Sequence, residues 1–210
     1  MANCGKKKSA SAKKKLLKRC VFLDRDGVIN EGINVNTAAD MRLLPGAKEA
    51  IARLKKAGFL VVIVTNQGGL GEALDGSIQW KGHPLTRENL TKIHAEMLRL
   101  LGDDAQPDLI KICPHATSLG CPCRKPKDGM LREAAAELGI DLTKSYMVGD
   151  RTSDVLAGTN AGATGILVLS GPDGANCKDK KEVAVGTPIH ASLKEAADWI
   201  LSQKSCGCSS

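Results

Sequence analysis

The stretch Val21-Phe22-Leu23-Asp24-Arg25-Asp26-Gly27-Val28 decides the fold of this chain. An apolar run ends in two carboxylates that stand one residue apart, and a glycine follows at once. Open α/β sheets bind ligands beyond the carboxyl ends of their strands. Alternate residues of an extended chain point to the same side, so Asp24 and Asp26 should converge on one site if the extended geometry persists through Arg25. Such a pair suits a divalent cation, or a nucleophile with an acid–base partner; a polar loop is the alternative.

Apolar segments of two kinds alternate along the rest of the chain. A continuous, β-branched run predicts a strand buried on both faces at 59–64, and shorter runs predict strands at 109–112, 146–148 and 166–169. Apolar residues at a spacing of three and four predict helices from Gly46 to Gly58, at 87–101, at 130–138, before Gly162 and at 193–201. The segments 30–44, 71–86 and 170–187 are expected to be loops. This alternation predicts an α/β fold with a Rossmann-like, doubly wound parallel sheet.

The basic character of the chain is confined to its beginning. The 210 residues carry a formal net charge of +7, but residues 1–23 hold eight Lys and Arg and no acid, and removing these eight leaves −1. We therefore expect a basic disordered arm at 1–18, one domain at 19–203 and a frayed tail at 204–210. The arm is interpreted as a solubilising tail, with a targeting peptide or a tether to an anionic surface as alternatives.

The composition also bears on the partners of the protein. An aromatic content of 2% and a nearly neutral body argue against a nucleic-acid partner, because single-strand binders stack bases on aromatic side chains. No apolar run approaches the ~20 residues that cross a bilayer. We expect a soluble, cytoplasmic monomer without membrane contact.

Three of the eight cysteines and one of the four histidines form a cluster that predicts a metal site. Without a secretory signal, a reducing compartment is favoured, and clustered cysteines then indicate metal binding rather than disulfides. The pattern C-x-H-x5-C-x-C is formed by Cys113, His115, Cys121 and Cys123. Three sulfurs and one imidazole within eleven residues suit a closed, structural zinc site, with a disulfide or free thiols as the alternatives.

Polar clusters follow two more of the predicted strands, and a fourth precedes a helix. They are Thr65-Asn66, Asp150 with Asp154, and Arg124-Lys125. Because the strands of a parallel sheet run one way, their carboxyl ends share one edge with Asp24 and Asp26. Carboxylates, a hydroxyl and a lysine at one edge predict a site for Mg²⁺ and a phosphate group.

The order of the four polar motifs along the chain is itself informative. DxDGV, TNQ, RKP and GDRTSD together resemble the phosphotransferases of the haloacid dehalogenase superfamily, over about residues 20–170. The resemblance implies that Asp24 is a nucleophile that forms an aspartyl-phosphate. It implies that Asp26 first protonates the leaving alkoxide and then activates water. Mg²⁺ would be held by the Asp24 carboxylate, the Asp26 backbone carbonyl and Asp150.

The same resemblance assigns the remaining polar residues. Thr65 and Lys125 would hold the phosphoryl oxygens, with Asn66 assisting. Arg151 would reach a more distant group of the substrate, and Asp154 would support the site without binding the metal.

The predicted zinc-binding segment 113–123, called the zinc loop below, runs into CRKP at 123–126. Together they resemble one branch of the superfamily in particular. That branch contains heptose-bisphosphate phosphatases and histidinol-phosphatases, which lack a large cap domain, and there Arg124 would help bind substrate. We therefore expect removal of the 7-phosphate of D-glycero-D-manno-heptose 1,7-bisphosphate. Histidinol-phosphatase, a nucleic-acid 3′-phosphatase and a non-catalytic phosphate-binding module are the alternatives. Two features depart from the heptose enzymes: residues 30–36 contain no aromatic side chain, and the loop at 71–86, with Trp80 and His83, is longer.

Overall fold

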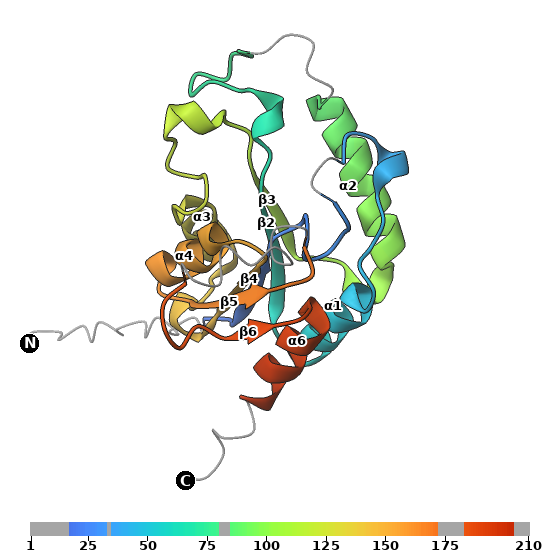
Figure 1. Ribbon diagram of the computed structural model, residues 1–210, viewed down its shortest axis with the longest axis vertical. Coiled ribbons are helices and arrows are strands. Elements are labelled where there is room, and N and C mark those ends of the chain that lie inside the picture. Colours follow the sequence, from blue (N-terminus) through green and yellow to red (C-terminus); the bar gives the residue numbers. More distant parts are fainter. Residues whose placement is uncertain (1–16, 33–34, 80–84, 172–182, 204–210) are drawn as a thin grey trace, which may run out of the picture.

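A computed structural model describes residues 17–32, 35–79, 85–171 and 183–203. Within them, six parallel strands form one sheet in the order β3-β2-β1-β4-β5-β6 (Figure 1). The strands are β1 (Cys20–Leu23), β2 (Leu60–Asn66), β3 (Leu109–Cys113), β4 (Tyr146–Gly149), β5 (Thr164–Val168) and β6 (Ile189–His190). The expected Rossmann-like α/β fold is confirmed.

Helices cover both faces of the sheet. The helices α1 (Ala47–Lys56), α2 (Arg87–Leu101) and α6 (Leu193–Ser202) lie on one side, and α3 (Gly129–Leu138) and α4 (Thr152–Ala161) lie on the other (Figure 1). Side chains alternate between the two faces of the sheet along β1, so this strand contributes to the core on each side. Val21 and Leu23 pack into the core beneath α1, α2 and α6, whereas Cys20 and Phe22 pack into the core beneath α3 and α4. All four side chains are fully buried, as expected for a central parallel strand.

Two predicted strands begin at other residues in the structure, and a further strand was missed. β2 is Leu60–Asn66, whereas the apolar run predicted a strand at 59–64. β5 begins at Thr164 and ends at Val168, whereas the apolar pattern predicted a strand at 166–169. Thr164 is exposed and Gly165 lacks a side chain, so neither residue adds to the apolar run that marked the strand. β6 was missed because it has two residues, of which Ile189 is exposed and His190 is polar.

The strand order places a crevice at the end of β1. From β1 the chain proceeds to β2 and β3 on one side, and it returns to β4 and β5 on the other side. Ligands of doubly wound sheets bind at such a reversal, outside the carboxyl ends of the strands. Gly27 turns the chain there with φ +81°, and a Cβ atom at this position would collide with the Asp150 carboxylate. Only glycine allows this close approach.

The long loop after β2 folds into a small hairpin over its first half. Ala73 N–H donates to the Ser77 carbonyl at 2.8 Å, and Glu72 N–H donates to the Pro114 carbonyl in the zinc loop at 3.2 Å. The Glu72 carboxylate also pairs with Arg87 at the start of α2. The hairpin is therefore attached to both α2 and the zinc loop. Trp80 and His83 lie outside the described residues.

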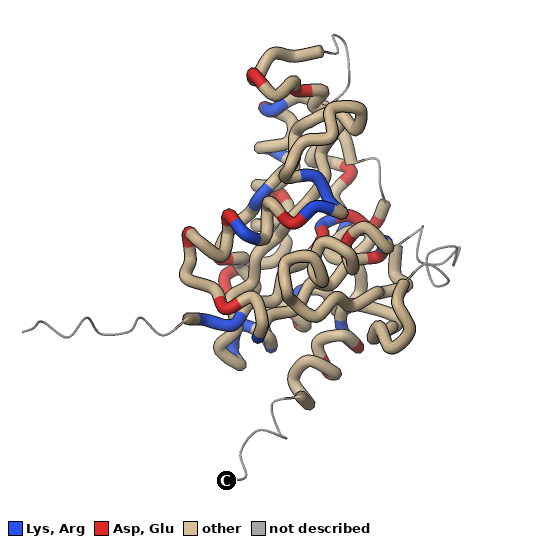
Figure 2. Tube along the Cα trace, turned by 90° about the vertical axis from the view of Figure 1, so that its left-hand side faces the viewer, with Lys and Arg blue, Asp and Glu red and all other residues tan. Residues whose placement is uncertain are grey.

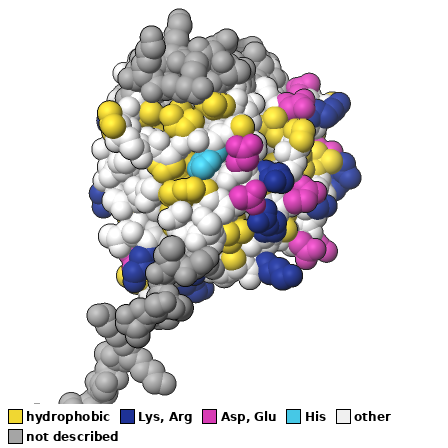
Figure 3. Space-filling model, turned by 60° about the horizontal axis from the view of Figure 1, so that its bottom comes forward, with side chains coloured by type: hydrophobic (Ala, Val, Ile, Leu, Met, Phe, Trp, Pro, Cys, Tyr) yellow, Lys and Arg dark blue, Asp and Glu magenta, His cyan; other side chains and the backbone are white. Residues whose placement is uncertain are grey.

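The described part of the chain forms one body without a separate cap domain (Figure 1). Acidic and basic residues are interspersed along its trace (Figure 2), and both signs also lie side by side on the face shown in Figure 3. No helix among these residues is long and apolar enough to cross a membrane. The predicted tail and all but the last two residues of the predicted basic arm lie outside the described residues.

Candidate functional site

The sheet brings the predicted polar clusters to one cavity. Asp24 directly follows β1, Thr65 and Asn66 end β2, and Asp150 directly follows β4, although Asp150 itself is not among the residues that line the cavity. The cavity measures about 170 Å³ and is lined by Asp24, Asp26, Thr65, Asn66, Arg124, Lys125, Arg151, Ser153 and Asp154. All the predicted phosphate-binding residues are thus brought together. Ser153 was not predicted individually, although it belongs to the GDRTSD motif.

Lys125 is buried between two carboxylates. Its Nζ lies 2.8 Å from Asp24 Oδ1 and 2.7 Å from Asp154 Oδ1, and it donates to the Val64 carbonyl at 2.8 Å. Burial alone would lower the pKa of Lys125, but Asp154 and Asp24 together hold it above its usual value. The lysine therefore carries a fixed positive charge on the floor of the cavity.

Asp24 has a pKa that is set mainly by its burial and by the charge of Lys125. Its Oδ1 also accepts a hydrogen bond from the backbone N–H of Arg25 at 2.8 Å. Burial is the main cause that raises its pKa to about 6, and Lys125 opposes the rise. The carboxylate is therefore held in place but only moderately stabilised as an anion, and most of it is ionised at neutral pH.

Asp26 reaches the cavity by a different geometry from the one expected. The strand ends at Leu23, and Arg25 begins a tight turn. The Arg25 carbonyl accepts a hydrogen bond from the backbone N–H of Ile29 at 2.9 Å. The extended geometry thus does not persist through Arg25. Asp26 nevertheless lines the cavity, and its carboxylate is held by Arg25, by Asn30 at 3.0 Å and by Gln67 at 3.2 Å.

None of these three supporting residues was predicted as part of the site. Arg25 is almost completely buried, which no sequence pattern indicated for an arginine between two acids. Gln67 belongs to the TNQ motif, but only its two neighbours were assigned a role. Its amide donates to both Thr65 Oγ1, at 2.9 Å, and Asp26 Oδ2. His94 is half-buried and its Nε2 lies 3.3 Å from Arg25 Nη1, so it stands at the polar edge of the site.

The acidic cluster fits a magnesium ion. Oxygen atoms from Asp24, Asp150 and Asp154 all lie within 4.8 Å of one another, and all three residues are buried. Mg²⁺ takes oxygen ligands and is usually held by one or two carboxylates together with water and substrate phosphate. A Cβ atom at Gly27 or Gly171 would collide with the Asp150 carboxylate, so both glycines let the backbone pack directly against this group.

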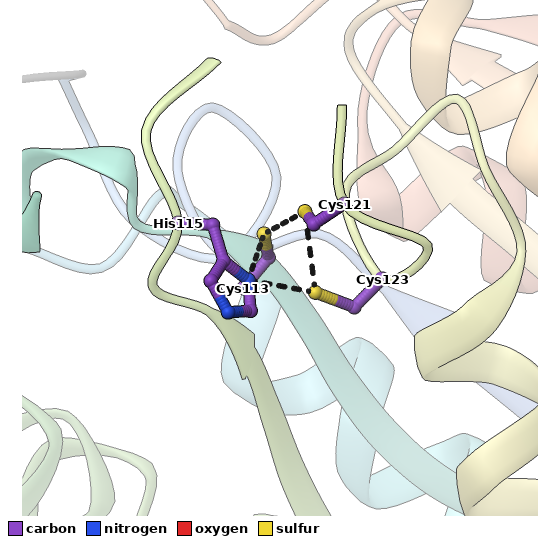
Figure 4. A group of neighbouring side chains, drawn as sticks. All are labelled: Cys113, His115, Cys121 and Cys123. Carbon is purple, nitrogen blue, oxygen red and sulfur yellow. Dashed lines mark hydrogen bonds between the residues drawn. The ribbon is translucent and has the colours of Figure 1, made fainter. Parts of the chain in front are cut away.

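The predicted zinc ligands point toward one another (Figure 4). Cys113 Sγ lies 3.4 Å from Cys121 Sγ, and His115 Nδ1 lies 3.1 Å from Cys123 Sγ. All four ligand atoms lie within 4.8 Å of one another. A tetrahedral zinc site with bonds of about 2.3 Å separates its sulfurs by roughly 3.8 Å. The three cysteines form no disulfide, so the cluster fits zinc and not the disulfide alternative.

Hydrogen bonds join the zinc loop to the cavity. Lys125 N–H donates to Asn66 Oδ1 at 3.1 Å, and Asn66 Nδ2 donates to the Lys125 carbonyl at 3.2 Å. Arg124, which follows the ligand Cys123 directly, also lines the cavity. A Cβ atom at Gly68 would lie 2.9 Å from Arg124 Nη1, so the guanidinium packs against the turn after β2. The loop that carries the cysteines thus delivers two cationic residues to the site.

Comparison with known proteins places this site in a family. A family model described as HAD-hydrolase-like matches residues 122–196. Over 188 residues, the chain is 34% identical to D-glycero-beta-D-manno-heptose-1,7-bisphosphate 7-phosphatase of Bordetella bronchiseptica, covering 88% of this chain and 99% of that protein. The chain belongs to the HAD-like hydrolase family. Its membership confirms the resemblance drawn from the four motifs and the prediction of a hydrolase.

Other relatives in this HAD-like family agree. The protein of the same name from Pseudomonas putida is 36% identical over 156 residues, which cover 73% of this chain and 83% of that protein. A crystal structure of the B. bronchiseptica D,D-heptose 1,7-bisphosphate phosphatase, complexed with magnesium and phosphate, matches with a TM-score of 0.77 and 34% identity, covering 88% of this chain and 99% of that one. The corresponding phosphatase from Burkholderia thailandensis matches with a TM-score of 0.62 and 30% identity, covering 88% of this chain and 99% of that one.

Proposed function

We propose that this HAD-like hydrolase is a magnesium-dependent phosphomonoesterase that removes the 7-phosphate of D-glycero-D-manno-heptose 1,7-bisphosphate through an aspartyl-phosphate. The observation that carries the proposal is the pairing of Asp24 with the buried Lys125 inside a cavity that Thr65 and Asn66 also line. The cavity joins a nucleophile to a cation and to hydrogen-bonding groups suited to a phosphate.

In the proposed first step, Asp24 attacks phosphorus. A bond forms between its carboxylate oxygen and phosphorus while the ester bond to the sugar oxygen breaks. Asp26 gives a proton to the departing oxygen. It then takes a proton from the water that hydrolyses the aspartyl-phosphate. An alkoxide is a poor leaving group, so this proton is worth roughly 10²–10⁴-fold in rate.

The phosphoryl oxygens would be held by the cation and by neighbouring hydroxyl and amide groups. Lys125 supplies a point charge, Thr65 a hydroxyl and Asn66 an amide. Asp24, Asp150 and the Asp26 backbone carbonyl would hold Mg²⁺, which when bound offsets the repulsion between a carboxylate and a phosphate dianion. The Asp154 carboxylate, paired with Lys125 at 2.7 Å, would fix the lysine and support the metal ligands.

The relatives' names support the sugar bisphosphate as substrate. Such a molecule carries a second phosphate away from the reacting one. Arg124 and Arg151 both line the cavity, and their guanidinium groups are of the kind that binds an anion or sugar hydroxyls. The zinc loop would act structurally, by setting the position of Arg124 and Lys125.

A comparison of substrates tests this proposal. The purified protein with Mg²⁺ should hydrolyse heptose 1,7-bisphosphate with a kcat/KM well above those for histidinol phosphate and a DNA 3′-phosphate. Faster hydrolysis of histidinol phosphate would transfer the assignment to the alternative branch. Absence of turnover on all three, with phosphate still bound, would favour a non-catalytic phosphate-binding module.

A further inference from the structure

Arg25 is a buried side chain to which the proposed reaction assigns no role. Its guanidinium grips the neighbouring Asp26 carboxylate with two nitrogens. Arg25 Nε lies 3.1 Å from Oδ1, and Nη2 lies 2.9 Å from Oδ1 and 2.8 Å from Oδ2. The Arg25 side chain is 1% exposed, so this pair is shielded from water on the arginine side. Charge-assisted, bidentate contacts of this type fix the orientation of a carboxylate.

The other end of the guanidinium is fixed by a helix. Arg25 Nη1 lies 3.3 Å from Nε2 of His94, which stands on α2. An arginine nitrogen can only donate, so His94 Nε2 must accept and the imidazole is neutral. This agrees with the pKa of His94, which burial and the charge of Arg25 lower to about 4. His94 on α2 thus fixes the position of the Arg25 guanidinium, and the guanidinium in turn fixes the orientation of the Asp26 carboxylate.

The two carboxylate oxygens of Asp26 accept hydrogen bonds from different sets of donors. Oδ1 accepts from Arg25 Nε, from Arg25 Nη2 and from Asn30 Nδ2 at 3.0 Å. Oδ2 accepts from Arg25 Nη2 and from Gln67 Nε2, at 3.2 Å, which is the longest contact of the set. The Gln67 amide has a second acceptor in Thr65 at 2.9 Å. Its contact with Oδ2 can therefore give way, which leaves Oδ2 as the atom that can carry a proton.

We propose that Arg25, braced by His94, is a positioning residue that aims Oδ2 of Asp26 at the leaving oxygen of the phosphate ester. This inference rests on the proposed function. As the ester bond to phosphorus breaks, its electron pair stays on the sugar oxygen, which takes the proton from Oδ2. Asp26 becomes a carboxylate in the same step, and the positive charge of Arg25 stabilises it. Arg25 thus acts on the proton transfer and not on the attack by Asp24.

Esters with different leaving groups separate this role from a structural one. Because kcat/KM reports the steps up to departure of the leaving group, it isolates the proton transfer from later hydrolysis. A sugar alkoxide needs the proton, whereas the p-nitrophenolate of p-nitrophenyl phosphate leaves without it. In Arg25→Met, kcat/KM for the sugar bisphosphate should fall roughly 10- to 100-fold, part of what a positioned acid contributes, while that for p-nitrophenyl phosphate changes far less. Arg25→Lys keeps the charge without the bidentate grip and should show a smaller split.

Variants of His94 complete the test. His94→Gln keeps an acceptor and should retain the wild-type ratio of the two kcat/KM values, whereas His94→Leu should shift the ratio in the direction of Arg25→Met. Arg99→Ala removes an exposed arginine from the same helix and should change neither value. If Arg25→Met does not fold, Arg25→Lys and His94→Leu carry the test. Equal losses on both esters, or no loss on either, would overturn the positioning role. A wild-type protein inactive on both esters would instead contradict the proposed function itself.

Discussion

Lys125 Nζ lies 2.8 Å from Asp24 Oδ1, and both side chains are buried at the end of β1. This contact joins residues 101 positions apart in the chain. It couples the proposed nucleophile to the loop that carries the predicted zinc ligands, and three predictions concern groups along this connection.

Replacement of Lys125 by methionine should abolish most of the activity and destabilise the protein. Lys125 lowers the pKa of Asp24 against the effect of burial, so without it this pKa should rise above about 6 and less carboxylate is available at neutral pH. Removing one partner of a buried ion pair typically costs about 3–5 kcal/mol in the free energy of unfolding. Denaturant unfolding and hydrolysis rates check both effects. Lys92→Met, an exposed change on α2, is the control. Full activity in Lys125→Met would contradict its role.

Loss of zinc should loosen the loop that delivers Arg124 and Lys125. We expect about one zinc per chain by metal analysis, and Cys121→Ser should lose it because a hydroxyl does not replace a thiolate ligand. The unfolding midpoint Tm should fall by roughly 5 °C or more, which corresponds to about 2 kcal/mol. Cys20→Ala, a buried cysteine outside the cluster, should keep its zinc. A zinc-free wild-type protein with unchanged stability would refute the structural site.

Asn66→Ala should uncouple the end of β2 from Lys125. The two reciprocal hydrogen bonds at 3.1 and 3.2 Å would be lost, each worth about 1 kcal/mol. KM for the substrate should rise and kcat should fall, because the lysine is held less firmly. Steady-state kinetics beside a circular dichroism spectrum that stays native check this. Unaltered kinetics would remove Asn66 from the site.

His94 should make stability depend on pH below neutrality. Its pKa is lowered to about 4 by burial and by Arg25, against an unfolded value of 6.5. The unfolded chain therefore binds more protons than the folded one between these values, so the contribution is present above pH 6.5 and is lost as the pH falls toward 4. The loss should reach about 3 kcal/mol at most. His94→Gln should flatten this part of the stability profile measured by urea unfolding; an identical slope in the variant would contradict it.

The sequence predicted the residues at strand ends because parallel strands share one edge. Asp24, Thr65 and Asp150 each follow or end an apolar run, so topology alone brings them together. The gathering of the three cysteines and His115 was predictable because these residues lie within eleven positions of one another. The fate of Arg25 was not predictable in this way. A charged residue in a turn is usually solvated, whereas Arg25 is buried and contacts His94, which stands 69 residues later in the chain.

Other parts carried no periodic signal. The hairpin after β2 is held by backbone hydrogen bonds and by the contact of Glu72 with Pro114, which no apolar pattern reports. The strand β6 is too short and too polar to stand out from a loop. Local pattern thus located the proposed reacting groups, while some of the residues that contact and orient them come from distant parts of the chain.

The most direct test of the account is the turnover of heptose 1,7-bisphosphate, with Mg²⁺, by the wild-type protein and by Asp24→Asn. The substitution keeps the size of the side chain and removes the attacking carboxylate. We predict steady release of inorganic phosphate by the wild type and no turnover by Asp24→Asn, with both proteins folded and both able to bind phosphate. A variant that keeps near-full activity would contradict Asp24 as the nucleophile.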